Sequence, residues 1–144
     1  MPLVVLVTAG QANDSPILSA LLDGLRVPRV GPGRPRTRPD AVLGDKAYSG
    51  RGHRRRLRAA GVTAVIPEPS DQVRNRTARG SNGGRPPAFD ADRYKDRNVV
   101  ERAFAHLKQW RGIATRYDKL NRIYRSAVML HTVIRWARSI RDTL

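Results

Sequence analysis

The hydrophobic positions of the chain include three short apolar runs. They are Leu3–Thr8, Ala41–Asp45 and Val62–Ile66, each bounded by glycine, proline or a charged residue. Apolar runs of this length between such breakers are typical of strands. We therefore expect a buried strand in the first run and short strands in the other two, with Asp45 at the carboxyl end of the second.

Helical spacing of apolar residues predicts four helices. Asn13–Pro16 is typical of a helix start, because capping residues precede a proline in the first turn. Gly50–Ala60 predicts an arginine-rich helix that ends at Gly61. Two longer helices are expected at 92–110 and 120–142. The apolar stripe of the last one is Ile123, Ala127, Leu130, Ile134 and Ala137.

Two segments have the composition of loops. Val27–Pro39 is rich in proline, glycine and arginine, and residues 67–90 form a basic stretch rich in glycine and proline with almost no apolar residues. The alternation of strands and helices predicts an α/β fold. Three strands make a thin sheet, so we interpret residues 1–144 as one partial domain, the back part of a larger fold.

The charge adds a first functional clue. The chain has 144 residues and a formal net charge of +16, with 28 basic residues against 12 acidic ones, and all but four of the basic residues are arginine. This balance is typical of nucleic-acid binding, and arginine favours bidentate contacts with phosphates. The alternative is a GC-rich genome, which explains arginine over lysine but not basic over acidic.

Other function classes are excluded or disfavoured. The chain has no cysteine, which excludes disulfides, cysteine zinc sites and thiol catalysis. No stretch approaches the roughly 20 apolar residues of a membrane span. The apolar N-terminal residues lack the basic start of a signal peptide. The simplest expectation is a cytoplasmic protein without a membrane partner.

Four polar side chains share one side of the predicted helix at 92–110. On a helical wheel Tyr94, Arg97, Glu101 and Lys108 lie within an arc of roughly 60°. A carboxylate there can bind a metal, and the cations can hold phosphate oxygens. The alternative is a solvated face with an Arg97–Glu101 ion pair. An apolar face for the core lies beside the stripe, and its members are Val99, Val100, Ala103, Phe104, Leu107 and Trp110.

Asp45 stands where ligands of open α/β sheets usually bind, at the carboxyl end of a strand. Asp45 and Glu101 could share a divalent cation. The alternative is that Asp45 is a helix cap or an ordinary loop carboxylate.

These residues carry a resemblance to a known family. The segments 44–48, 94–102 and 108–111, with 83–90 and 114–119, resemble the DDE transposases of bacterial insertion sequences, and most closely the group numbered five in the wider family-four assembly. The family motif is Tyr, two residues, Arg, three residues, Glu, six residues, Lys. Tyr94, Arg97, Glu101 and Lys108 match every spacing.

The resemblance implies an RNase H-like catalytic core that cleaves DNA and transfers strands with two Mg²⁺ (or Mn²⁺) ions. It implies that Asp45 and Glu101 are metal-binding catalytic carboxylates, that Arg97 and Lys108 contact DNA phosphates, and that Tyr94 orients DNA. The partners would be the double-stranded DNA of the transposon ends and of the target, at the bacterial nucleoid. Further residues expected to contact DNA are Lys46, Arg51, Arg54, Arg55, Arg85 and Arg111. Arg56 and Arg58 belong to the same arginine-rich helix, for which we favour phosphate contact over the alternative of a solvated face.

The family pattern also requires an earlier aspartate, on a strand that would lie before Met1. Asp14 and Asp23 follow the first predicted strand and do not replace it. We therefore expect the chain to be inactive alone, with the metal site completed by an upstream half of the transposase, and with self-association, as in a homodimer, through an open sheet edge. Two alternatives remain: a non-catalytic DNA-binding remnant that inhibits full-length transposase, and an unrelated RNA-binding protein.

Overall fold

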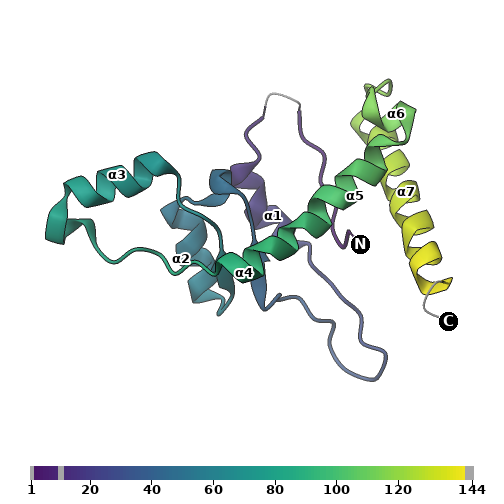
Figure 1. Ribbon diagram of the computed structural model, residues 1–144. Helices are drawn as coiled ribbons and strands as arrows, with labels where there is room; N and C mark the ends of the chain where they lie inside the picture. Colours follow the sequence, from purple (N-terminus) through teal and green to yellow (C-terminus); the bar gives the residue numbers. More distant parts are fainter. Residues whose placement is uncertain (1, 10–11, 142–144) are drawn as a thin grey trace. The chain divides into compact units, whose positions relative to one another are not determined.

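Two of the three predicted strands pair in parallel and form a small sheet. Strand β1 (Ala41–Leu43) and strand β2 (Thr63–Val65) are connected by helix α2 (Arg51–Ala59), so this stretch is a β-α-β unit. The register pairs Ala41 with Thr63, Val42 with Ala64 and Leu43 with Val65. The computed structural model describes residues 2–9 and 12–141, and Figure 1 shows the path of the chain. The described chain is mixed α/β and mostly helical.

The end of α2 confirms the glycine stop expected from the sequence. Gly61 has a φ of +67°, in the left-handed region that glycine adopts without steric cost. The N–H of Gly61 donates to the carbonyl of Arg58 (3.0 Å) and the N–H of Val62 donates to that of Leu57 (2.8 Å). This pair of bonds is a Schellman motif, with Val62 and Leu57 both buried beside it.

The described chain divides into two units. Unit 1 consists of Met1–Asn13, Ala20–Thr37 and Asn98–Leu144, and unit 2 of Asp14–Ser19 and Arg38–Arg97. The core of unit 2 is centred on Leu57, Val65 and Ile66, each 1% exposed. In unit 1, Ile113, Val128, His131 and Thr132 are buried.

The remaining elements follow in chain order. They are η1 (Ser15–Ile17), α1 (Leu18–Asp23), η2 (Lys46–Tyr48), α3 (Ser70–Ala78), η3 (Gly80–Gly83), α4 (Ala91–Tyr94), η4 (Lys95–Arg97), α5 (Asn98–Lys108), α6 (Arg111–Ala114) and α7 (Asn121–Arg141), where η denotes a 3₁₀ helix. Within residues 2–9 and 12–141, no helix is both long and apolar enough to cross a membrane.

The prediction of a continuous loop over residues 67–90 is wrong. Helix α3 and the 3₁₀ helix η3 occupy its centre, and the chain then returns beneath α3 towards α4 (Figure 1). The sequence of α3 is almost entirely polar, so it lacks the apolar periodicity from which a helix is predicted. Polar contacts hold α3 instead. Arg76 Nη2 lies 2.6 Å from Glu68 Oε2, and Gln72 Nε2 donates to Ser49 Oγ at 3.0 Å.

The prediction of a buried strand at Leu3–Thr8 is also wrong. This segment has no strand structure, and Leu3 and Leu6 are exposed. A strand requires a neighbour that satisfies its backbone hydrogen bonds. Here side chains take that place: Trp136 Nε1, Asn121 Nδ2 and Arg116 Nη2 each donate to a backbone carbonyl at 3.3 Å. The acceptors are Pro2, Val7 and Thr8 respectively.

The predicted helix at 92–110 is divided. Helix α4 ends at Tyr94, the turn η4 follows, and α5 begins at Asn98. The apolar face of α5 is also not a core face, because none of its residues is buried and Val99, Val100 and Phe104 are about half exposed, at 49%, 50% and 58%. Helical spacing identifies an apolar face but not whether a partner covers it.

The last predicted helix is confirmed as α7, up to the end of the described residues. Its buried face differs from the predicted stripe. Val128, His131 and Thr132 are buried, whereas Ile123 and Leu130 of the predicted stripe are exposed. The ring of Trp110 contacts that of His131 edge-on, with centroids 5.1 Å apart. His131 is buried through this aromatic contact, whereas the neighbouring Leu130 is exposed.

Candidate functional site

Asp45 lies two residues beyond the end of β1, and its side chain is exposed. It caps η2: Oδ1 accepts a hydrogen bond from the backbone N–H of Ala47 at 2.9 Å. The cap alternative raised from the sequence is thus present in the structure. A cap uses one acceptor site of a carboxylate that has about four, so it fixes the orientation of the side chain and is compatible with metal binding.

The backbone around Asp45 is held against the core of unit 2. A Cβ placed on Gly44 would lie 3.4 Å from Tyr48 Cβ and 3.5 Å from Ile66 Cγ1, which is van der Waals contact, so the backbone here runs directly against both side chains. Burial raises the pKa of the Tyr48 phenol, and the negative charges of Asp14 and Asp45 add to that effect. Tyr48 therefore stays neutral next to the carboxylate at physiological pH.

Glu101 and Lys108 belong to unit 1 and project from α5. They are two turns apart, which places them on the same side of the helix, and both are exposed. Glu101 lies in the first turn of α5, where the helix dipole favours a negative charge. Lys108 ends the helix, where the dipole favours a positive charge.

Tyr94 and Arg97 belong to unit 2 and contact each other. Arg97 Cζ lies 5.4 Å from the centroid of the Tyr94 ring, a cation–π arrangement, and Phe89 packs on the same ring at 5.3 Å. Of the four polar residues predicted to form one stripe, Tyr94 and Arg97 contact each other in unit 2, and Glu101 and Lys108 lie on one side of α5 in unit 1.

The donor chemistry for a metal is only partly present. Carboxylates are the donors that Mg²⁺ and Mn²⁺ prefer, and Asp45 and Glu101 supply one each. Among residues 2–9 and 12–141, however, no three His, Cys, Asp or Glu side chains come together as a metal site. Carboxylates are thus the right type of donor for these ions, but the described residues do not bring three such side chains together.

A cavity of about 550 Å³ in unit 2 gathers many of the predicted DNA contacts. Its walls come from α2, from α3 and from the segment that returns after η3. The lining residues are Ser49, Arg51, Arg54, Arg55, Arg58, Glu68, Gln72, Asn75, Arg76, Arg79, Gly83, Arg85 and Pro87. Arg51, Arg54, Arg55 and Arg85 of the prediction are among them, whereas Lys46 and Arg111 are exposed elsewhere.

Arg54 differs from the other arginines of this cavity. Its Nη2 donates to the Ile66 carbonyl at 2.7 Å and its Nε to the Ser49 carbonyl at 3.2 Å. Burial lowers the pKa of this guanidinium, and the charge of Glu68 opposes the shift. Arg54 is thus anchored to the backbone and connects α2 with the residue that follows β2.

Arg76 and Arg79 line the cavity and were not among the predicted site residues, whereas Arg58 lines it and belongs to the arginine-rich helix for which phosphate contact was expected. A signal for Arg58 is present in the sequence. Arg51, Arg54, Arg55 and Arg58 have the spacing i, i+3, i+4, i+7, which is one face of a helix. Arg76 and Arg79 could not be placed, because their position depends on the unpredicted helix α3.

Comparison with known proteins identifies a family that the chain matches. The family described as Transposase DDE domain matches residues 1–136. A Burkholderia cepacia protein named as a transposase for insertion sequence element IS402 is 33% identical over 118 residues, which are 82% of this chain and 48% of that relative. A Brucella ovis protein named as a transposase for IS6501 is 30% identical over 138 residues, 96% of this chain and 90% of the relative. The chain spans about half the length of the first relative. No solved structure matches the chain.

Proposed function

The chain belongs to the Transposase DDE domain family, and from this membership we propose that it is part of an insertion-sequence transposase that cleaves DNA and joins strands. The match over residues 1–136 carries the proposal. The named relatives support DNA transposition as the process and DNA as the partner. The β-α-β unit of unit 2 would belong to an RNase H-like core, and the protein would act on the bacterial chromosome.

We assign the metal-binding role to Asp45 and Glu101. DDE domains use divalent metal ions, and we propose Mg²⁺ or Mn²⁺ because both favour carboxylate oxygens. When bound, such ions activate the attacking oxygen and stabilise the leaving one. Support for Asp45 comes from its place beyond β1 and its capped, oriented side chain. Support for Glu101 comes from its exposure on α5 at the motif spacing.

The cationic residues would hold the DNA. Arg97 and Lys108 are proposed to contact phosphates, and Tyr94 to orient the substrate. The cation–π contact restricts the rotamers of Tyr94 and Arg97, which lowers the entropy lost on binding. The exposed cations Lys46 and Arg111 would add electrostatic attraction without a fixed geometry.

We propose further that the chain does not cleave DNA by itself. Two carboxylates make an incomplete set for a pair of metal ions. The third would come from the reading frame that precedes the chain in its insertion element, or from a second subunit.

The test measures excision of a marked element from a plasmid. The chain is expressed alone and together with the preceding reading frame, and only the pair should excise the element. In the active pair, Asp45→Asn and Glu101→Gln should each lower excision about 10²-fold or more, because a metal ligand is lost. Asp92→Asn is the matched control, because Asp92 is 92% exposed and pairs with Lys95 on the surface, so its loss should cost little.

Three results would contradict parts of this proposal. Excision by the chain alone would refute its inactivity. Normal excision by the Asp45 or Glu101 variants would refute their metal-binding role. Tighter binding of RNA than of DNA would favour an RNA-binding protein.

A second candidate function is a non-catalytic DNA-binding protein that inhibits full-length transposase. The arginine-lined cavity of unit 2 favours it, because this cavity needs neither carboxylate. Co-expression of the chain with an active transposase should then lower excision, and Glu101→Gln in the chain should leave that inhibition unchanged. If Glu101→Gln abolishes both DNA binding and inhibition while the parent chain shows no cleavage, Glu101 itself serves DNA binding and the cavity alone does not carry this function.

A further inference from the structure

The cavity between α2 and α3 has basic walls on opposite sides. Arg51, Arg55 and Arg58 come from α2, and Arg76, Arg79 and Arg85 from α3 and the segment after it. Among the described residues that line it, Glu68 alone is acidic, and it forms an ion pair with Arg76 at 2.6 Å. Unlike a convex basic surface, a hollow with cations on both sides surrounds an anion and concentrates the field on it.

One buried donor in this cavity lacks an acceptor. Arg76 Nη2 donates to Glu68, but Arg76 Nε is buried and has no hydrogen-bond partner among the described residues. A buried unpaired donor costs free energy, and a small shift of the Arg76 side chain towards an anion in the cavity would recover that cost. Together with the opposed arginines, this donor indicates that the cavity takes an anion.

The walls are rigidly built. Arg54 donates to the carbonyls of Ser49 and Ile66, and Gln72 donates to the Ser49 hydroxyl. The buried Ser49 thus connects α2 with α3, and Arg54 itself connects α2 with the residue after β2. The chain turns back after α3 with Gly83 packed directly against the Arg76 backbone. Glycine is required there, because a Cβ at this position would collide with the Arg76 carbonyl. A preformed cavity loses little entropy when it binds.

From these observations we propose that the cavity binds the sugar-phosphate backbone of a single DNA strand. The choice of DNA among anions rests on the proposed function. A volume of about 550 Å³ is in the range of a pocket for one small ligand, so a short length of one strand fits and a duplex does not. No aromatic side chain lines the cavity among residues 2–9 and 12–141. Bases therefore have no stacking platform, and the contacts are with phosphates whatever the sequence.

The test uses the purified full chain and a labelled oligo-dT of about 12 nucleotides, a length within the range that single-strand sites cover. Binding is followed by fluorescence anisotropy at increasing NaCl. The double variant Arg55→Gln/Arg58→Gln removes two contacts from one wall. The plot of log K against log[salt] has a negative slope, and the double variant should make it shallower by about 1.4, since each phosphate contact on a single strand contributes about 0.7.

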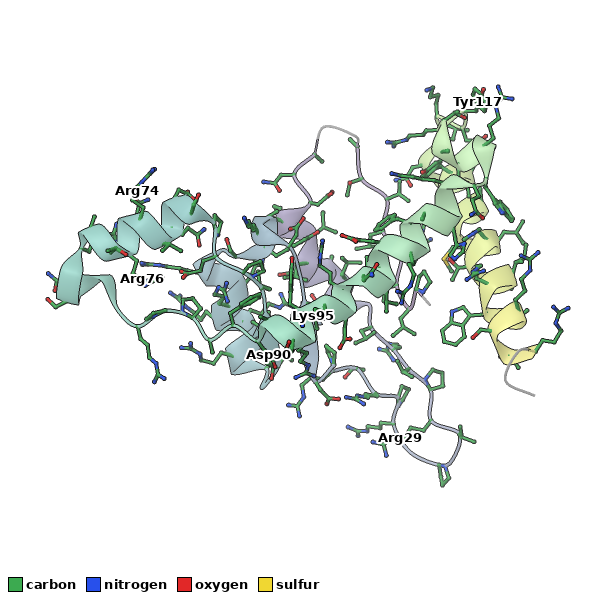
Figure 2. All side chains as sticks on the ribbon, in the orientation of Figure 1. Arg29, Arg74, Arg76, Asp90, Lys95 and Tyr117 are labelled. Carbon is green, nitrogen blue, oxygen red and sulfur yellow. The ribbon has the colours of Figure 1, made fainter. Side chains whose placement is uncertain are left out.

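The matched control is Arg74→Gln/Arg93→Gln, which removes the same charge. Both arginines are exposed, and neither lines the cavity. Figure 2 shows Arg74 and Arg76 leaving α3 in different directions. Arg85→Gln, outside any helix, is a second variant from the opposite wall and should lower the slope by about 0.7. Circular dichroism verifies that each variant is folded.

Four results would overturn the proposal. They are equal losses in the cavity and control variants, equal losses for the single strand and for the matching duplex, tighter binding of a matching RNA strand, and retained affinity for a strand with neutral methylphosphonate linkages. An abasic strand should bind as well as oligo-dT. Inorganic phosphate that displaces the strand at equal concentration would reassign the cavity to the free ion.

This outcome is independent of catalysis. If the cavity variants bind the strand normally while the complete transposase excises its element, the inference fails and the proposed function stands. If the cavity binds the strand but no excision is found in any combination, the inference stands and the proposed function fails.

Discussion

Unit 2 and the helices of unit 1 use their apolar residues in different ways. In unit 2, Leu57, Val65 and Ile66 are each 1% exposed, and they come from the β-α-β unit and its immediate continuation. In unit 1, α5 buries none of its residues, and Phe104 is 58% exposed. A β-α-β unit buries its own apolar residues, because its helix packs on its own strands. A single amphipathic helix needs a partner from elsewhere.

The largest effect is expected from Leu57→Ala in the core of unit 2. Truncation of a fully buried leucine lowers the free energy of unfolding by about 2–5 kcal/mol. The measurement is urea unfolding followed by circular dichroism and by tryptophan fluorescence. Both tryptophans, Trp110 and Trp136, belong to unit 1, so fluorescence reports that unit separately. If the units unfold independently, only the dichroism transition of unit 2 should move. A shift of both transitions by the same amount would show that the units unfold together.

A smaller loss is expected from Gly61→Ala, which tests the cap of α2 without changing the core. Alanine in the left-handed region destabilises the chain by about 1 kcal/mol. The amides of Gly61 and Val62, which close the Schellman motif, should lose protection from hydrogen exchange. Gly52→Ala, inside α2 where a Cβ meets open space, should instead stabilise the helix slightly. Equal effects of the two substitutions would refute the role of the cap.

A pH effect is expected from the buried His131 of unit 1. Burial lowers the pKa of His131, with further lowering from the charges of Arg135, His106 and Arg138, while a hydrogen bond with the His106 backbone opposes the shift. The folded pKa thus lies below the unfolded value of about 6.5. The stability that neutral His131 contributes is fully present above pH about 6.5 and is lost as pH falls through the folded pKa.

The measurement is the tryptophan transition at several pH values between 7 and 4. The His131→Leu substitution should make the tryptophan transition of unit 1 less dependent on pH. The unfolding transition of unit 2 should respond to pH as it does in the parent chain. A transition that is equally sensitive to pH in this variant and in the parent would assign the effect to another group.

The smallest effect on stability is expected from Phe104→Ser on α5. Because this side chain is mostly exposed, the substitution removes little buried apolar area. The free energy of unfolding should therefore change by less than about 1 kcal/mol. If α5 packs against a partner, the same substitution should weaken that association. Sedimentation velocity of the parent chain and of the Phe104→Ser variant over a range of concentrations measures this association. A large loss of stability in the isolated chain would show that α5 is already covered.

The sequence predicted α2, β1, β2 and α7 because each has a local signal. The strands are short apolar runs, α2 ends at Gly61, and α7 follows an uninterrupted helical period. It did not predict α3, where the contacts of Gln72 with Ser49 and of Arg76 with Glu68 replace apolar periodicity. For the candidate site, the spacing of Tyr94, Arg97, Glu101 and Lys108 identified the family motif. The contact between Tyr94 and Arg97 agrees with the helical wheel, which places residues i and i+3 side by side, although the turn η4 divides the predicted helix there.

The amino-acid sequence alone predicted the family, the basic character and the β-α-β unit. It could do so because motif spacing, charge and local periodicity are properties of neighbouring residues. Which side chains are buried depends on the folded chain. Leu3–Thr8 is apolar enough for a strand but finds side-chain donors instead of a second strand. The arginines of α2 and α3 form one cavity because α3 folds back through polar contacts. Burial depends on partners distant in the chain, and local pattern carries no information about them.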